Sequence, residues 1–212
     1  MKKLKVLNLY SGIGGNRKNW GDNDEITAVE LDPNIAKIYQ DFFPEDKVIV
    51  ADAHQYLLEN FENFDFIWSS PPCPSHSQLR KHLSMASGSK PIYPDMKLYE
   101  EILLLQGYFK GKYVVENVIS WYDPLVEPQT IQRHYFWANF IIHPTQFEKD
   151  NIKITNKQLK EKEAIEILQQ SHNINLDGYN IKNKRLLLRN CVNPKVGLHI
   201  FQEAYREKPR LF

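Results

Sequence analysis

Residues 7–20 read LNLYSGIGGNRKNW, a β-rich apolar run that enters a turn with three glycines, Gly12, Gly14 and Gly15. Glycines after the first strand of an α/β sheet let the backbone approach a ligand closely, and they place helix-end N–H groups near its anionic part. The turn is not a complete G-x-G-x-x-G pattern, so a purely structural glycine turn is an equally good interpretation. The residues that follow decide between the two.

Short β-rich runs alternate with helix-like stretches over the first 118 residues. The expected elements are strands at 6–10, 25–30, 47–50, 64–68 and 112–116 and helices at 33–43, 54–61 and 95–107. This spacing predicts an open, mainly parallel α/β sheet with right-handed crossovers. A late strand at 135–143 and a C-terminal helix at 199–206 complete the expected sheet domain.

Residues 144–188 differ from the rest of the chain because they are polar and rich in Asn, Lys and Gln. We expect a small insert there, between a larger domain at 1–143 and a C-terminal segment at 189–212 that returns to it. Residues 151–212 hold twelve Lys and Arg against six Asp and Glu, although the whole chain has a net charge of only +1. This split is a mild indication of an end that faces a polyanion, but a solvated helix at 157–170 explains part of it equally well.

The composition limits the class of protein. With 42% hydrophobic and 12% aromatic residues, the chain can bury a real core and is not expected to be disordered. Its two cysteines make no disulfide framework, which favours a reducing compartment. The first apolar run is too short and too polar for a signal peptide, and no run approaches transmembrane length. We therefore expect a soluble, cytoplasmic monomer with no membrane partner.

Two carboxylates follow the next strands of the expected sheet. Glu30 ends the second strand, where a carboxylate can accept hydrogen bonds from both hydroxyls of a ribose. Asp52 follows the third strand and suits an adenine amino group, but a helix cap is an equally good interpretation of this residue. The glycine turn lacks the Lys-Ser/Thr of a phosphate-binding loop. A nucleoside cofactor without phosphates is favoured, and S-adenosylmethionine fits better than NAD or ATP.

The second informative stretch is SSPPCPSHSQ, residues 69–78, directly after the fourth strand. A cysteine that merely fills a gap in the core is the default interpretation of Cys73. Its position at the ligand-binding edge of the sheet, with Glu116 at the end of the fifth strand, favours instead a nucleophile and an acid. A thiolate that adds to carbon-6 of cytosine makes carbon-5 nucleophilic, provided that an acid protonates nitrogen-3. Arg133 could hold oxygen-2 of such a ring.

The ordered motifs LNLYSGIGG, VELDP, ADAH, PPC, ENV, QTIQRHYFW and NCVNP together resemble those of a DNA (cytosine-5) methyltransferase. The resemblance covers nearly the whole chain apart from 144–188. It implies an α/β, Rossmann-like S-adenosylmethionine-dependent methyltransferase sheet with a small appended recognition region. It also implies methyl transfer to carbon-5 of cytosine in double-stranded DNA, on a base flipped out of the duplex because carbon-6 cannot be reached in the stack.

The resemblance also assigns roles to particular residues. It implies that Cys73 is the nucleophile, Glu116 the acid at nitrogen-3 and Arg133 the contact to oxygen-2. The implied cofactor-binding set, with Tyr10 stacked on the adenine, is Tyr10, Gly12, Gly14, Gly15, Glu30, Leu31, Asp52, Ala53, Pro72, Asn190 and Val192. The implied nucleic-acid contacts are Ser77, Arg80 and Lys81. No metal site is expected.

The chain departs from the family pattern at five positions. The family usually has Asp, Phe, Gln, Arg and Gly where this chain has Asn8, Tyr10, Pro74, Ile131 and Arg189, respectively. The insert is also short for a target-recognition region. About 45 residues offer few base contacts, each worth about 1–3 kcal/mol of discrimination, so we expect a short or relaxed recognition sequence. Residues 78–94 show no clear periodicity and are interpreted either as a flexible surface loop or as a mobile lid that closes over DNA.

Three other functions stay open at this point. The first is the same chemistry on RNA, because one lineage of the family modifies transfer RNA. The second is an inactive module that only binds cofactor or nucleic acid, and the third is a cysteine hydrolase, which would need His76 held against Cys73. Cys73 and His76 have ligand-like spacing, but no second Cys/His pair completes a zinc site, and Cys191 is expected to be packed.

Overall fold

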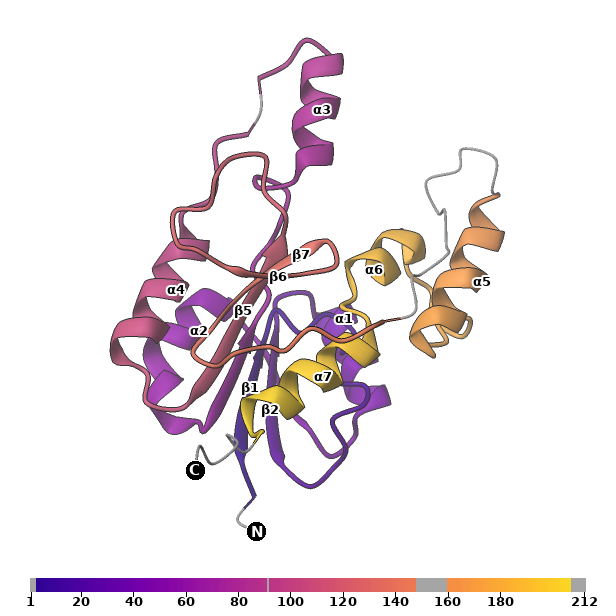
Figure 1. The fold of residues 1–212 in the computed structure, drawn as a ribbon. Coiled ribbons are helices and arrows are strands. Elements are labelled where there is room, and N and C mark those ends of the chain that lie inside the picture. Colours follow the sequence, from indigo (N-terminus) through magenta and orange to yellow (C-terminus); the bar gives the residue numbers. More distant parts are fainter. Residues whose placement is uncertain (1–2, 91, 148–159, 207–212) are drawn as a thin grey trace.

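The computed structural model describes residues 3–90, 92–147 and 160–206, built around a seven-stranded sheet of order β3-β2-β1-β4-β5-β7-β6 (Figure 1). Its strands are β1 (Lys5–Leu9), β2 (Glu25–Glu30), β3 (Lys47–Val50), β4 (Phe66–Ser69), β5 (Lys112–Val118), β6 (Gln129–Ile131) and β7 (His134–Ala138). The first five run parallel, and β7 is antiparallel to both β5 and β6. The predicted α/β fold is confirmed, and the strand order reverses between β1 and β4, where such sheets bind ligands.

Helices cover both faces of this sheet (Figure 1). The two outer layers are α1 (Pro33–Phe42) with α7 (Pro194–Ala204) and, on the opposite face, α2 (Ala53–Asn60) with α4 (Lys97–Tyr108). Strand β1 is apolar on both sides, since Leu7 and Leu9 pack into the α2–α4 layer and Val6 into the α7 layer, all with no exposed surface. This pattern is typical of a parallel strand covered on both faces.

Three further helices of the described chain, and one short 3₁₀ turn, lie outside these layers or extend them. They are α3 (Gln78–Ala86), α5 (Glu161–His172), α6 (Lys184–Asn190) and the 3₁₀ turn η1 (Phe61–Asn63). Helix α3 projects beyond the carboxyl edge of the sheet, at the top of Figure 1. Helices α5 and α6 share one buried apolar cluster with α1, through Leu168, Leu188 and Ile38. The division into 1–143, 144–188 and 189–212 stays a prediction.

Most predicted element boundaries agree with the structure to within about two residues. Residues 78–94, expected without regular structure, contain helix α3. The late strand expected at 135–143 is the second arm of the β6–β7 hairpin and ends at Ala138. The C-terminal helix begins earlier than expected, at Pro194, because the Asn193 side chain caps it and proline is favourable in the first turn.

Two glycines let the C-terminal segment lie directly against the glycine turn. A Cβ at Gly15 would lie 2.7 Å from the Val192 carbonyl oxygen, and a Cβ at Gly197 would overlap with the backbone of Asn16. Trp20 reinforces this junction, since its indole N–H donates to the Gly197 carbonyl over 3.1 Å. The first and last described parts of the chain therefore pack as one unit beside β1.

We expect Gly197→Ala to lower the free energy of unfolding by about 1–3 kcal/mol, because the added methyl meets backbone that can move only if α7 shifts. Urea unfolding followed by circular dichroism measures the change. Gly107→Ala is the matched control, since Gly107 also lies in a helix and an added Cβ there meets nothing within 4 Å. The control should raise stability by about 0.5–1 kcal/mol, and equal shifts in the two variants would contradict the close packing.

Candidate active site

Five of the predicted functional residues lie at the carboxyl edge of the sheet. Each belongs to the end of a different strand or to the turn after it, namely Tyr10 after β1, Glu30 in β2, Asp52 after β3, Cys73 after β4 and Glu116 in β5. Parallel strands have this edge in common, so the fold brings residues together that are far apart in the sequence.

The glycine turn is held by the carboxylate of Glu30. The Gly12 N–H donates to Oε2 over 2.9 Å, and the Asp32 N–H donates to Oε1 over 3.0 Å. Gly12 and Gly14 have φ of +54° and +80°, which residues with a side chain rarely adopt, and a Cβ at Gly14 would overlap with the ring of Phe43. Each carboxylate oxygen has two lone pairs, so Glu30 can still accept hydrogen bonds from a ligand.

A pair of buried asparagines fixes this turn to β1. Asn16 Nδ2 donates to Asn8 Oδ1 over 2.7 Å, and Asn8 Nδ2 donates back to Asn16 Oδ1 over 3.4 Å. Asn8 has no exposed surface. The amide explains why this position departs from the Asp of the family pattern, because only an amide can both donate to and accept from Asn16.

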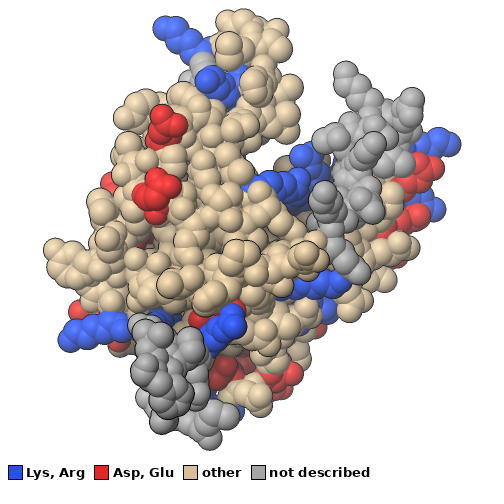
Figure 2. Space-filling model, in the orientation of Figure 1, with Lys and Arg blue, Asp and Glu red and all other residues tan. Residues whose placement is uncertain are grey.

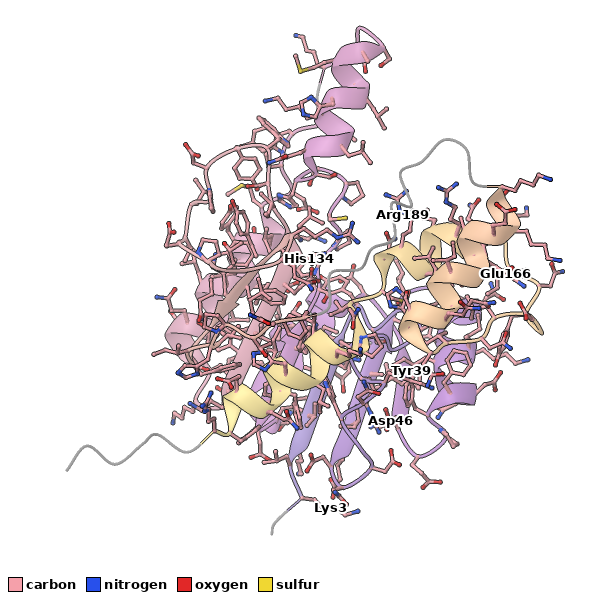
Figure 3. The ribbon with its side chains drawn as sticks, turned by 45° about the vertical axis from the view of Figure 1, so that its right-hand side comes forward. Lys3, Tyr39, Asp46, His134, Glu166 and Arg189 are labelled. Atoms are coloured by element: carbon pink, nitrogen blue, oxygen red, sulfur yellow. The ribbon has the colours of Figure 1, made fainter. Side chains whose placement is uncertain are left out.

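A buried ion pair lies close to Asn8. Arg17 donates from Nε and from one terminal nitrogen to the two carboxylate oxygens of Asp46, over 2.9 and 3.0 Å. The Tyr39 hydroxyl donates to the same carboxylate over 2.8 Å, and Figure 3 shows Tyr39 and Asp46 side by side. Burial raises the pKa of Tyr39 well above its usual value, so the phenol keeps its proton. The turn thus rests on a satisfied polar network.

Tyr10 leaves β1 in a left-handed conformation, with φ of +53°. Its hydroxyl donates to Glu101 Oε1 over 2.6 Å, and Glu101 has no exposed surface. The same carboxylate accepts from Ser69 Oγ over 2.5 Å and lies 3.0 Å from His54 Nδ1. Burial, and after it the negative charge of Glu101, raises the pKa of Tyr10 and keeps the phenol protonated.

Glu101 was not predicted from the sequence, because Glu100 and Glu101 together look like a solvated helix face. The signal that could have found it is the apolar spacing of Leu98, Ile102 and Leu105. Those three residues mark the buried side of α4, and Glu101 lies among them.

Asp52 caps helix α2, as one of its two interpretations predicted. Its side chain accepts from the Gln55 N–H over 3.0 Å, and this bond lowers the pKa of the carboxyl group. Asp52 is also exposed at the sheet edge, so a contact to adenine stays a prediction beside the observed cap.

Ser11 has a buried hydroxyl for which the described residues supply no hydrogen-bond partner. A buried polar group without a partner costs free energy, so its place inside the glycine turn is a reason to expect a ligand there. The Glu30 carboxylate bonds to the same turn, and Tyr10 and the exposed Asp52 follow two strands of the same sheet edge. These groups fit the ribose hydroxyls and the base of an adenosyl group.

Cys73 lies half-buried in the turn between β4 and α3. Its carbonyl accepts from the backbone N–H groups three and four residues on, each over 3.0 Å, and these bonds lead into α3. The Asn117 side chain of β5 donates to the Pro71 carbonyl over 3.0 Å. This bond ties the segment that carries the thiol to the strand that carries Glu116.

Trp121 also holds the turn that carries Cys73, through residues that follow the cysteine. Its backbone N–H donates to the His76 carbonyl over 3.1 Å, and its indole N–H donates to the Ser75 carbonyl over 2.9 Å. The turn that carries Cys73 is therefore bonded to two segments of the chain that follow it.

Two of the three predicted nucleic-acid contacts are already engaged within the protein. Ser77 forms an isolated β-bridge with Ser120, and Lys81 Nζ lies 4.9 Å from the ring centre of Trp121. The side chain of Arg80, the third, lies outside the described residues. Their contacts to nucleic acid stay predictions.

Glu116 is buried in β5, and its Oε1 lies 3.8 Å from the imidazole Nε2 of His134, which is labelled in Figure 3. Val118 pairs with His134 across the β5–β7 ladder, so His134 and Glu116 point to the same face. Arg133, the predicted contact to oxygen-2, has an exposed side chain, and its carbonyl accepts from the Ile119 N–H over 3.4 Å. His134 was not predicted, because its place beside Glu116 follows from the hairpin register.

His76 does not form the pair that a cysteine hydrolase would need. Its Nδ1 is hydrogen-bonded to the Tyr122 hydroxyl, and its buried Nε2 has no hydrogen-bond partner among the residues described. Burial lowers the pKa of His76, so the ring is mostly neutral at pH 7. Neither ring nitrogen is hydrogen-bonded to Cys73.

The remaining predicted cofactor contacts lie near the same edge but differ in exposure. Val192 reaches the glycine turn at Gly15, while Asn190 is exposed. The others are an exposed Leu31, a buried Ala53 and an exposed Pro72. Cys191 packs against Gly15 as expected, and burial raises its pKa to about 12.

A notch opens between α3 and α6 on the face that Figure 2 shows. Lys and Arg side chains gather along its α6 side, and α6 carries Lys184, Arg185 and Arg189. Figure 3 shows Arg189 above α6, on the open side of the molecule. Positive charge at this position suits a polyanionic substrate.

Within residues 3–90, 92–147 and 160–206, no group of three or more His, Cys, Asp or Glu could hold a metal ion. No helix in the described part of the chain is long and apolar enough to cross a membrane.

Comparison with known families and proteins gives a consistent result. The family model described as C-5 cytosine-specific DNA methylase matches residues 4–118. The human tRNA (cytosine(38)-C(5))-methyltransferase is 26% identical over 168 residues, which cover 73% of this chain and 41% of that protein. The enzyme of the same name from Spodoptera frugiperda is 32% identical over 85 residues, 37% of this chain and 26% of that protein. The chain spans less than half the length of these curated relatives.

Two solved structures have a similar fold over almost the whole chain. The Entamoeba histolytica methyltransferase EhMeth gives a TM-score of 0.57 at 14% identity, covering 97% of this chain and 98% of that one. A mutant of Spodoptera frugiperda DNMT2 also gives 0.57, at 15% identity, covering 96% of this chain and 100% of that one. The Rossmann-like methyltransferase sheet predicted from the sequence is thus confirmed.

We expect Asp46→Asn to lower the free energy of unfolding by about 3–5 kcal/mol, because it removes the buried carboxylate of the pair and leaves Arg17 only the exposed carboxylate of Asp22. Chemical unfolding at neutral pH measures the loss. Asp22→Asn is the matched control, since Asp22 pairs with the same guanidinium but its side chain is 82% exposed. That change should cost less than about 1 kcal/mol, and a similar loss in both variants would show that burial does not decide the effect.

Proposed function

We propose that this chain, which belongs to the C-5 cytosine-specific DNA methylase family, transfers a methyl group from S-adenosylmethionine to carbon-5 of cytosine in DNA. The observation that supports this best is the hydrogen bond from Asn117 to Pro71, because it ties the segment of Cys73 to the strand of Glu116. A thiol and a carboxyl group carried by two segments that are bonded to each other would provide the nucleophile and the acid for the reaction.

Cys73 and Glu116 would act on two positions of the cytosine ring. The thiolate of Cys73 forms a bond to carbon-6 while Glu116 gives its proton to nitrogen-3, which makes the ring an enamine that is nucleophilic at carbon-5. S-adenosylmethionine would supply the electrophilic methyl group to carbon-5 and would leave as S-adenosylhomocysteine. Loss of the carbon-5 proton to water then lets the carbon–sulfur bond break, and the nitrogen-3 proton returns to Glu116.

The residues around the glycine turn would hold the cofactor. Glu30 suits the ribose hydroxyls, Asp52 the adenine amino group and Tyr10 the face of the adenine ring. The Ser11 hydroxyl, which has no partner among the described residues, supports a ligand at this turn. The groups are already fixed by the protein, which lowers the entropic cost of binding.

DNA is the substrate that the matched family description names, and the basic α6 side of the notch would contact its phosphates. Transfer RNA is the second candidate, because the curated relatives are tRNA (cytosine(38)-C(5))-methyltransferases. In either substrate the cytosine must leave its stack to reach Cys73.

The test uses methyl-tritiated S-adenosylmethionine with separate pools of duplex DNA and transfer RNA. We expect label in DNA, and no label with the Cys73→Ser variant, because serine is a far weaker nucleophile than a thiolate. Label confined to transfer RNA would replace DNA by the second candidate. A protein that binds the cofactor but labels neither pool would contradict methyl transfer and favour a binding module.

We expect Asn117→Ala to lower kcat by about 10–100-fold, because a displacement of the thiol of about 1 Å is enough for such a loss. The Kd for S-adenosylmethionine should stay within about twofold, since the side chain of Asn117 bonds to the Pro71 carbonyl and the Val118 N–H, which lie outside the glycine turn. Steady-state kinetics and calorimetric titration separate the two effects.

Asn139→Ala is the matched control. Asn139 donates its side-chain amide to the Gly111 carbonyl over 2.8 Å, a bond of the same kind at the opposite end of β5. This variant should lose stability and keep its kcat. Equal losses of kcat in the two variants would contradict a positioning role for Asn117.

A further inference from the structure

The buried carboxylate of Glu101 joins three separate parts of the edge of the sheet. Tyr10 donates to it from the end of β1, Ser69 donates from the end of β4, and His54 Nδ1 lies 3.0 Å away in the first turn of α2. Two of these groups belong to the proposed cofactor site, since Tyr10 would face the adenine and His54 follows Asp52 by two residues. Glu101 itself lies beneath that site, with no exposed surface.

Stability alone does not account for a carboxylate at this position. An apolar side chain of similar volume often stabilises a core as well as a buried charged group does. The neighbouring residues Leu98, Ile102 and Leu105 already bury α4 against the sheet. The role of Glu101 is therefore to be inferred from the three groups that contact its carboxylate, which belong to Tyr10, His54 and Ser69.

The backbone of Tyr10 is an independent observation. Alternation along β1 would place Tyr10 on the same face as Asn8, toward α1 and α7. The left-handed φ of +53° reverses this, so the ring packs instead beside Leu9 in the α2–α4 cluster. Such a conformation is unfavourable for a bulky side chain and persists only where the surroundings hold it. The bond from the phenol to Glu101 is such a restraint.

We propose that Glu101 is a positioning residue for the cofactor, which fixes the Tyr10 ring and the N-terminus of α2 in the arrangement that binds the adenine of S-adenosylmethionine. This inference rests on the proposed function. Glu101 acts through Tyr10 and His54 and does not touch the cofactor itself.

His54 offsets the buried negative charge. Its Nε2 lies 3.3 Å from the Glu100 carboxylate, so the ring bridges Glu100 and Glu101. The hydrogen bond to Glu101 raises the pKa of His54, which favours the imidazolium form. An imidazolium at this position lies between the two carboxylates and leaves the Glu101 oxygens to accept from Tyr10 and Ser69.

The test is calorimetric titration of the full chain with S-adenosylmethionine, for the wild type, Tyr10→Phe, Glu101→Leu and the double variant. Each single change should raise the Kd about tenfold, because the first removes the donor and the second removes the acceptor of the same bond. The double variant should be no weaker than the weaker of the two single variants. Tyr10→Phe leaves the contacts of His54 and Ser69 to Glu101 in place, so it tests the inference even if Glu101→Leu does not fold.

Glu100→Gln is the matched control, because Glu100 contacts the same histidine from a side chain that is 62% exposed. Its Kd should stay within about twofold of the wild type. Saturating cofactor should restore the kcat of Tyr10→Phe, which a general loss of structure would not allow.

If the wild type binds S-adenosylmethionine and both single variants have the same Kd as the wild type, the inference is overturned. It is also overturned if the losses of binding free energy in the two single variants add in the double variant. A wild-type protein that binds no S-adenosylmethionine would overturn the proposed function together with this inference. The two failures are thus distinguished by the wild-type titration alone.

Discussion

The close approach of the C-terminal segment to the glycine turn is the constraint on which the rest of the structure depends. It needs a hydrogen in place of a side chain at Gly15 and Gly197, so that the Val192 carbonyl and helix α7 reach the backbone of the turn. With α7 in this position, Phe201 stacks on Trp20 with ring centres 4.9 Å apart, and the α7 face of the sheet is closed. The glycine turn and the segment that contains Val192 and α7 therefore form the same part of the sheet edge.

Polar groups hold the glycine turn from both faces of the sheet. On the α1–α7 face Asn8 bonds to Asn16, close to the ion pair of Arg17 with Asp46. On the α2–α4 face the anchor is the carboxylate of Glu101. Buried polar networks of this kind are geometrically more specific than apolar packing, because each bond has a preferred length and direction. The turn is therefore fixed before any ligand binds, and the chain needs little rearrangement at this edge.

The sheet could be predicted from the sequence because alternation of strands and helices is a local pattern, and the strand ends then place Glu30, Cys73 and Glu116 at one edge. Helix α3 could not be predicted in this way, because it buries little apolar surface. Leu79 and Leu83 are both more than half exposed, so its apolar residues do not follow the period of a helix packed on a core. Contacts between residues that are far apart in the sequence also could not be predicted. Tyr10 lies 91 residues from Glu101, and His134 meets Glu116 only through the hairpin register.

Helix α3 starts from the turn that carries Cys73, and this turn is bonded to Asn117 before the cysteine, at Pro71, and to Trp121 after it, at Ser75. A rotation of α3 about its base would displace the far end, at Ala86, much more than the sulfur of Cys73. The sulfur of Cys73 thus lies close to the axis of such a rotation. A movement of the far end of the helix toward a substrate would therefore leave the thiol near the strand that carries Glu116.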